Sequence, residues 1–210
     1  MNRSIIDISP PLTSDLAVFP GDTALRREVL VQRTGGKGLT VSTLHATVHL
    51  GAHVDAPSHY GDNGDSIEAQ SLALYLGPCQ VLRVANRAGT RVSVADLEGA
   101  EISEERVLLQ TGSFPNPKKW STDFRGLEPE LVDHLADRGV ALVGVDTPSV
   151  DTAESKDLPA HARCFAREVS ILEGIVLQHV EAGKYELIAL PLNLVGFDGS
   201  PVRAILRTLT

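Results

Sequence analysis

Four of the chain's seven histidines fall between residues 45 and 59, together with one aspartate. Neutral imidazole and carboxylate are good ligands for Zn²⁺ and related divalent ions. Three of these residues, His49, His53 and Asp55, would form a first coordination shell that leaves one position open for water. A bound ion lowers the pKa of such a water toward neutral, and the nearby His59 could then carry protons. The segment therefore indicates a hydrolytic metal site.

The spacing of these residues fits a strand better than a helix. Every even position from 44 to 56 is apolar, whereas the odd positions from 45 to 55 carry histidine, threonine, glycine or aspartate. This period of two places His49, His53 and Asp55 on one face and the apolar residues on the other. On a helix Asp55 would point away from the two histidines, and Gly51 and Pro57 would disturb the helix. We therefore expect a strand that ends at Pro57, with Gly51 leaving room for an ion to approach.

The alternative is that these polar residues only cover the wet face of a half-buried strand. That explanation is the better one for a single histidine, and we keep it for the outlying His45. It is weaker for three histidines and Asp55 within the eleven residues from His49 to His59.

Short runs rich in β-branched or aliphatic residues, bounded by Gly, Pro, Asp or Asn, predict the strands that position this segment. They span residues 4–8, 27–32, 40–50, 80–85, 107–110, 141–145, 186–190 and 203–209. Helical spacing is clearest over 129–138, which Gly139 would end. Residues 67–75 and 93–97 are weaker helical segments, and Ser93 could cap the second. Strands outnumber helices without regular alternation, which favours an α+β fold with a mixed or largely antiparallel sheet over a doubly wound fold.

Residues 112–126 contain Pro115, Pro117 and Trp120 and predict a long loop. Long ordered loops often cover functional sites. Trp120 is the chain's one tryptophan. It could close the site, enter a partner subunit or pack onto the surface, and the sequence does not separate these roles.

The composition predicts one domain over residues 1–210. Hydrophobic residues make up 42% and aromatic residues 4%, enough for one aliphatic core. A net charge of −8 without a Lys/Arg-rich block argues against a nucleic acid partner. No apolar run has the length of a membrane span or the form of a signal peptide. Cys79 and Cys164 form no disulfide framework, so we expect a cytoplasmic protein in which they pack as small hydrophobic residues.

The histidine segment resembles the H-x-G-[TA]-H-x-D-x-P-x-H signature of the cyclase-like metal-dependent hydrolases. Within that family the likeness is greatest to the bacterial kynurenine formamidases, or arylformamidases. The likeness covers nearly the whole chain, through several motifs in the same order. These motifs are residues 19–22 (FPGD), 75–79 (YLGPC), 144–151 (GVDTPSVD), 154–156 (ESK), 171–174 (ILEG) and 186–192 (ELIALPL).

The resemblance implies a compact α/β domain of the swivelling β/β/α type, a homodimer and two zinc ions per subunit, with manganese as an alternative metal. The implied metal ligands are His49, His53, Asp55, His161 and Glu173. The first three would bind one ion, Asp55 would bridge to the second, and the last two would complete the second. His59 matches the family's proton donor and acceptor.

The implied reaction is hydrolysis of N-formyl-L-kynurenine to L-kynurenine and formate, in tryptophan degradation, by a metal-activated water with His59 moving the proton. One residue departs from the family pattern. The family usually has tryptophan where this chain has Phe19, at a position that contacts the aromatic substrate. Phenylalanine keeps an apolar face but loses area and the indole N–H, which leaves room for a shifted substrate preference.

Three other functions remain open. The first is a related amide or lactam hydrolase, such as one acting on isatin. The second is a family member that binds metal or a small ligand without catalysis, although the presence of His59 and Glu173 argues against it. The third is a strand-rich domain without a site. Measuring bound metal would distinguish the domain without a site from the other functions. Measuring formate release would distinguish the non-catalytic binder from a formamidase.

Overall fold

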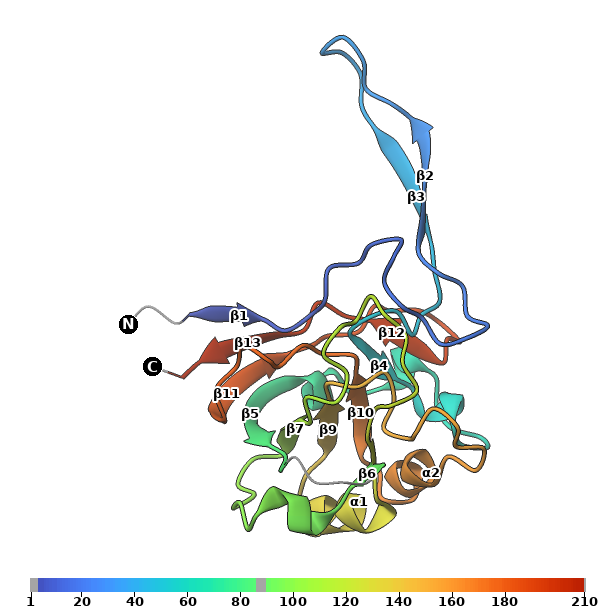
Figure 1. The fold of residues 1–210 in the computed structure, drawn as a ribbon. Coiled ribbons are helices and arrows are strands. Elements are labelled where there is room, and N and C mark those ends of the chain that lie inside the picture. Colours follow the sequence, from blue (N-terminus) through green and yellow to red (C-terminus); the bar gives the residue numbers. More distant parts are fainter. Residues whose placement is uncertain (1–3, 86–89, 210) are drawn as a thin grey trace.

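The computed structural model describes residues 4–85 and 90–209, and its centre is a curled sheet of nine strands (Figure 1). The strand order is β1-β13-β11-β5-β7-β9-β10-β4-β12. The strands are β1 (Ile5–Asp7), β4 (His53–Asp55), β5 (Leu76–Arg83), β7 (Arg106–Gln110), β9 (Leu142–Val145), β10 (Ser170–Glu173), β11 (Gly183–Ile188), β12 (Gly199–Pro201) and β13 (Ile205–Thr208). Strands β5, β7, β9 and β10 run parallel to one another, and the remaining neighbours are antiparallel. The prediction of a mixed, largely antiparallel sheet is confirmed.

Two α-helices, α1 (Pro129–Ala136) and α2 (Pro159–Ala166), connect the parallel strands β7, β9 and β10. They contact each other and lie against one face of the sheet (Figure 1). Helix α1 buries Leu131, Val132 and Leu135. It ends before Gly139, whose positive φ of 80° suits a helix terminus. Because both helices cover the same face, the alternation of strands and helices here does not produce a doubly wound fold.

The strands bury residues on both faces, which explains their aliphatic composition. Along β7, Val107 and Leu109 pack in the core beside the helices, whereas Leu108 packs in a second core on the opposite face of the sheet. The two free cysteines lie in different cores. Cys79 lies in the core that contains Leu108, and Cys164 lies in the core beside the helices. Their predicted role as small buried hydrophobic residues is confirmed.

A hairpin of β2 (Arg26–Val31) and β3 (Val41–His45) stands away from the body (Figure 1). We call residues 26–45 the arm. The arm exposes several large apolar side chains, among them Leu30, Leu39 and Leu44. Isolated two-stranded hairpins are marginally stable in water. The large apolar side chains of the arm are therefore exposed to solvent, whereas those in the cores of the body are buried.

The main error of the sequence interpretation concerns residues 40–59. The predicted continuous strand is two strands: β3 ends at His45, and β4 begins at His53 after a turn. Leu44, expected in the core, is 65% exposed, whereas the other even-numbered apolar residues from Leu50 to Ala56 are buried as predicted. Residues 46–52, between β3 and β4, belong to no strand, and Gly51 lies in the turn before β4 with a positive φ of 61°, which glycine adopts without steric cost.

Other predicted elements are found with shifted ends, and several were missed. Residues 67–75 form two 3₁₀ turns, Ile67–Ala69 and Leu72–Tyr75, instead of one helix. Ser93 does cap a short 3₁₀ helix, Val94–Leu97, through a capping box with Asp96. The missed elements are α2, β4 as a separate strand, β10, β12, and the small parallel pair of β6 (Arg91–Val92) and β8 (Gly126–Leu127). No helix among the described residues has the length and hydropathy needed to cross a membrane.

Candidate metal site

Strand β4 carries two of the candidate ligands on one face. His53 and Asp55 are two residues apart, so both side chains point to the same side, while Val54 between them is fully buried in the core. Strand β10 lies beside β4 with Glu173 directly opposite His53. Cross-strand partners place their side chains close together, and His53 Nε2 lies 3.3 Å from Glu173 Oε2.

His49 reaches the site from the turn before β4 and not from the face of a strand. The turn at Gly51 brings His49 Nδ1 to 3.0 Å from Asp55 Oδ1. A Cβ on Gly51 would lie 2.9 Å from the Leu12 side chain. The role expected for this glycine, close approach of an ion, is therefore wrong. Its missing side chain accommodates the turn and the packing of the N-terminal segment.

Helix α2 supplies His161, which Asp151 holds in place. His161 Nδ1 donates to Asp151 Oδ2 at 2.9 Å. The same carboxylate accepts the backbone N–H groups of Ala160 and His161 and a hydrogen bond from Arg91. Asp151 therefore caps the helix and fixes the histidine tautomer, which leaves Nε2 free to act as a ligand. His53 is fixed similarly, because its Nδ1 donates to the Gly51 carbonyl at 2.9 Å.

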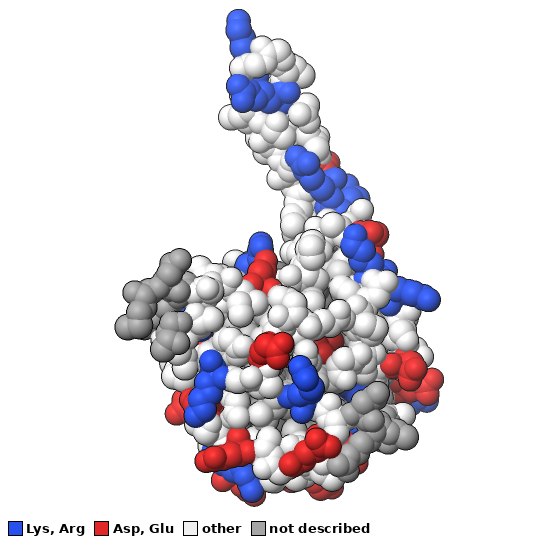
Figure 2. Space-filling view, turned by 60° about the vertical axis from the view of Figure 1, so that its left-hand side comes forward, with Lys and Arg blue, Asp and Glu red and all other residues white. Residues whose placement is uncertain are grey.

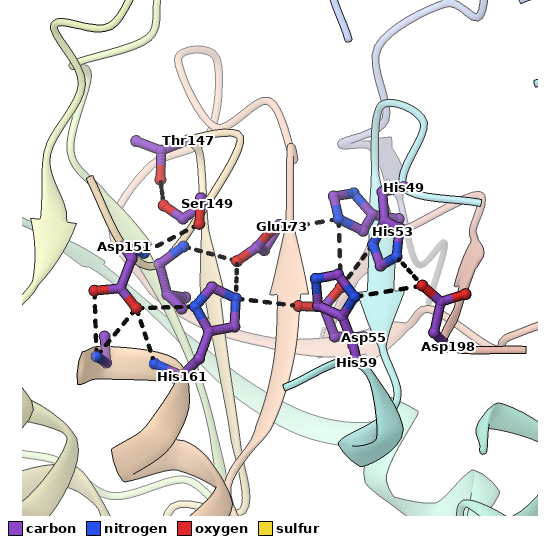
Figure 3. A network of polar contacts seen from close by, with 12 residues as sticks. His49, His53, Asp55, His59, Thr147, Ser149, Asp151, His161, Glu173 and Asp198 are labelled. Carbon is purple, nitrogen blue, oxygen red and sulfur yellow. Dashed lines mark hydrogen bonds and ion pairs between the residues drawn. The ribbon is translucent and has the colours of Figure 1, made fainter. Parts of the chain in front are cut away.

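Asp55 lies at the centre of the cluster (Figure 3). Its Oδ1 is 3.5 Å from His53 Nε2, and its Oδ2 is 3.6 Å from His161 Nε2. His161 Nε2 is also 3.6 Å from Glu173 Oε1. Oδ2 of Asp55 is buried and has no hydrogen-bond partner among the described residues.

These distances and the orphaned oxygen fit a divalent cation. The separations are longer than ordinary N–H···O hydrogen bonds of about 2.7–3.2 Å. Two ligands that each lie about 2.1 Å from a tetrahedral zinc are themselves about 3.4 Å apart. Two sets of donor atoms, from His49, Asp55 and His59 and from His53, Asp55 and Glu173, each lie within 4.8 Å of one another. The chain therefore has His/Asp/Glu groups able to bind metal.

A more exposed side of the cluster holds His59 and a residue that the sequence interpretation missed, Asp198. Asp198 Oδ2 lies 3.0 Å from His49 Nε2 and 3.4 Å from His59 Nδ1 (Figure 3). The Asp198 carbonyl accepts the backbone N–H of Ala56, which ties the segment before β12 to the end of β4. His59 itself ends the 3₁₀ turn Pro57–His59, as expected for a residue just beyond the strand.

Surrounding carboxylates favour the protonated imidazoles when no metal is bound. Burial alone would lower the pKa of His49, but Asp55 and Asp198 outweigh it and raise that pKa to about 9. Burial also opposes the charge on His161, yet Asp151 and Asp55 raise its pKa to about 10. Burial would raise the pKa of Asp55, but the imidazoles of His161 and His49 hold it well below its usual range. A metal ion would take the place of these protons.

The cluster opens into a cavity of about 460 Å³. His49, His53, His59, His161, Glu173 and Asp198 lie in its lining. Phe19, which is 39% exposed, and Trp120 also line this cavity. The position of Trp120 in this lining agrees with the first of the three roles considered for it, at the site. His45 lies outside the cluster and pairs with Glu28 at 3.0 Å, in agreement with its assignment as a non-ligand.

Comparison with known proteins agrees with this geometry. Residues 6–152 match the cyclase family model, described as "Putative cyclase". A kynurenine formamidase from Bordetella avium (strain 197N) is 41% identical over 207 residues, which cover 99% of each chain.

Solved structures agree as well. A predicted metal-dependent hydrolase from Bacillus stearothermophilus superimposes with a TM-score of 0.83 at 27% identity, covering 99% of both chains. Isatin hydrolase A from Labrenzia aggregata, bound to benzyl benzoate, superimposes with a TM-score of 0.84 at 22% identity, covering 99% of this chain and 94% of that one. At that identity the second likeness concerns the fold alone. The family match, the full-length identity and the fold together place this chain in the cyclase family of metal-dependent hydrolases.

Proposed function

We propose that the chain is an arylformamidase that hydrolyses N-formyl-L-kynurenine to L-kynurenine and formate, a step in tryptophan degradation. The observation that carries the proposal is the cluster around Asp55, in a chain 41% identical over its full length to a kynurenine formamidase. An aryl formamide would enter the cavity with its formyl group at the cluster and its ring toward Phe19. In this proposal residues 1–210 form one domain, and that domain carries this one activity.

We propose two zinc ions per subunit, with manganese as the alternative metal. His49, His53 and Asp55 would hold one ion, and Asp55 would bridge to a second held by His161 and Glu173. The two oxygens of Asp55 support the bridging role, since one faces His49 and His53 and the other faces His161. Bound there, such ions polarise a carbonyl and make hydroxide available near neutral pH.

The chain's own residues would then position the substrate and move protons. His59 lies beside the cluster in the lining of the cavity, so it can accept a proton from water. When the C–N bond breaks, the departing aniline nitrogen needs a proton, and His59 would donate it. Asp198, 3.4 Å from His59 Nδ1, would orient the ring so that Nε2 faces the reacting atoms.

The test is turnover of N-formylkynurenine, other aryl formamides and isatin, with metal content measured on the same sample. We expect formate release from the aryl formamides, loss of activity with a chelator, and recovery on adding zinc or manganese. Ring opening of isatin without formamide hydrolysis would replace this proposal with the lactam alternative. Bound metal without any turnover would indicate a non-catalytic family member.

We also propose that the protein is a homodimer joined through the arm. The arm exposes apolar side chains that the body does not cover, including Leu30 (58%) and Leu44 (65%). It carries four basic residues and one acidic residue, whereas the whole chain has a net charge of −8. Figure 2 shows basic side chains along the arm and many acidic ones over the body. A second copy therefore offers both apolar surface and opposite charge.

Sedimentation of the wild-type protein and of a Leu30→Asp/Leu44→Asp variant tests the dimer. We expect a dimer for the wild type and a monomer for the double variant. Leu72→Asp, at an exposed apolar residue outside the arm, is the matched control and should remain dimeric. A monomeric wild type, or a double variant that still dimerises, would contradict the role of the arm.

We place the protein in the cytoplasm. Cys79 and Cys164 are both free and buried, in separate cores, which fits a reducing compartment. Fractionation of cells that produce the protein checks this location.

A further inference from the structure

We infer that Trp120 forms the wall that contacts the aryl ring of the substrate and is the main determinant of preference for aryl over aliphatic formamides. The inference rests on the proposed function and concerns the far end of the same cavity. It follows from where the chain gathers its few aromatic residues, from how their loop is held, and from the chemistry of the two ends of the cavity.

Aromatic residues are scarce in this chain: one Trp, three Tyr and five Phe. Four of them nevertheless form one group in which Trp120 contacts each of the others. Its ring centroid lies 4.7 Å from Phe19, 6.3 Å from Phe114 and 6.1 Å from Phe124, all in edge-to-face geometry. Phe19, Phe114 and Trp120 line the cavity, while Phe124 is 3% exposed and supports the group from behind.

The loop that carries Trp120 is fixed at several points. The backbone N–H of Ala17 donates to the Pro117 carbonyl at 2.9 Å. Lys118 Nζ pairs with Asp15 Oδ2 at 3.0 Å, and Gln178 Nε2 donates to the Pro115 carbonyl at 2.8 Å.

The start of the loop is anchored as well. The backbone N–H groups of Thr111 and Gly112 both donate to the carboxylate of Asp146, at 3.0 and 2.9 Å. The loop that carries Trp120 is therefore fixed before a ligand binds. Binding to such a preorganised surface loses less conformational entropy than binding to a mobile loop.

The two ends of the cavity differ in chemistry. The imidazoles and carboxylates in its lining cluster around Asp55, whereas the rings of Phe19, Phe114 and Trp120 form a separate group that meets at Trp120. In an aryl formamide the ring is attached directly to the nitrogen of the bond that breaks. A substrate with its formyl group at the polar end must therefore direct its ring along the cavity, where apolar and edge-to-face contacts with the indole are available.

The first test compares formanilide with N-butylformamide as substrates. For Trp120→Ala we expect kcat/KM for formanilide to fall about 10- to 100-fold, mainly through KM, as for loss of a large buried apolar contact. Turnover of N-butylformamide should change by no more than about threefold. Trp120→Phe should fall between wild type and Trp120→Ala. Phe165→Ala is the matched control, because Phe165 has the same exposure as Phe19 but lies outside the cavity lining, and it should keep the wild-type ratio.

The second test needs no turnover, because the one tryptophan reports on the wall directly. Acetanilide, a non-formylated aryl amide, should change the tryptophan emission of the wild-type protein saturably, whereas N-butylacetamide should not. An unchanged aryl-to-butyl ratio in Trp120→Ala and Trp120→Phe, with no response to acetanilide, would overturn the inference and leave the arylformamidase proposal intact. No formamide turnover by the wild type, with a normal acetanilide response, would instead overturn the proposed function and keep the aryl wall.

Discussion

The two sides of the metal-binding cluster differ in burial and in the partners of their histidines. On the inner side the side chains of His53 and His161 are each 4% exposed, and each donates Nδ1 to a fixed acceptor. On the outer side the His59 side chain is 34% exposed, and its partner Asp198 is 49% exposed. The inner side is therefore suited to holding an ion in one geometry, whereas the outer side can exchange protons with substrate and solvent.

The largest effect should come from removing an inner histidine. His53→Ala or His161→Ala should lose metal, and turnover should fall by more than the roughly 10²–10⁴-fold typical of general acid–base residues. Metal content and formamide turnover are measured on one sample. His134→Ala, at a histidine on α1 outside the cluster, should keep both. A metal-replete, active His161→Ala protein would rule out its assignment as a ligand.

Removing the outer histidine should separate catalysis from metal binding. His59→Ala should keep near-normal metal content while turnover falls by about 10²–10⁴-fold, because proton transfer to the leaving nitrogen is lost. The same two measurements check this outcome. Full turnover would disprove the proton role, and loss of metal would move His59 into the coordination shell.

A smaller effect is expected when the support of an inner ligand is weakened and the ligand itself is retained. Asp151→Asn removes the charged acceptor of His161 Nδ1. Metal affinity should fall by about 10- to 100-fold, the usual consequence of losing such a partner. Competition with a chelator of known affinity measures the change. Unchanged affinity would mean that packing of α2 alone orients His161.

The smallest effect should be a pH dependence of the metal-free protein. His49 and His161 have pKa values of about 9 and 10, above the ordinary value of 6.5, because Asp55 and its neighbouring carboxylates outweigh burial. Their contribution to stability is therefore complete below pH 6.5 and is lost as the pH rises through 9 and 10. Thermal unfolding of the chelated protein should show a Tm that falls over this range.

The zinc-loaded protein should not show that fall, because metal replaces the protons and binds more tightly as they dissociate. A chelated protein whose Tm rises between pH 7 and 10 would contradict the assigned protonation.

The alternation of side chains along a strand predicted the placement of the ligands that lie close together in the sequence. His53 and Asp55 share a face because residues two apart on a strand always do. His49 was predicted on that face for the wrong reason, because the chain turns at Gly51 and reaches Asp55 by another route. The pairing of Glu173 with His53 joins two strands far apart in the chain, and only the family likeness pointed to it.

Helix α2, Asp151 and Asp198 were missed for physical reasons. The inward face of α2 carries the polar His161, so an apolar stripe of helical spacing does not form. Asp151 was part of a recognised motif, but its role depends on the hydrogen bonds that it makes with His161, ten residues later on α2. Asp198 precedes a three-residue strand and has no local signal. The strand-rich fold class, in contrast, was predictable because most strands are apolar runs with clear turn residues at their ends.

The position of β4 in the sheet has a consequence for the order of events during synthesis. Strand β4 carries His53 and Asp55, and the strands that pair with it in the described part of the chain are β10 and β12, both of which are made much later. A ribosome-bound chain that ends before Pro201 therefore cannot hold these residues in their final arrangement. The proposed ligands are complete only when Glu173 of β10 has been made, so a metal at this site would be bound late in translation or after it.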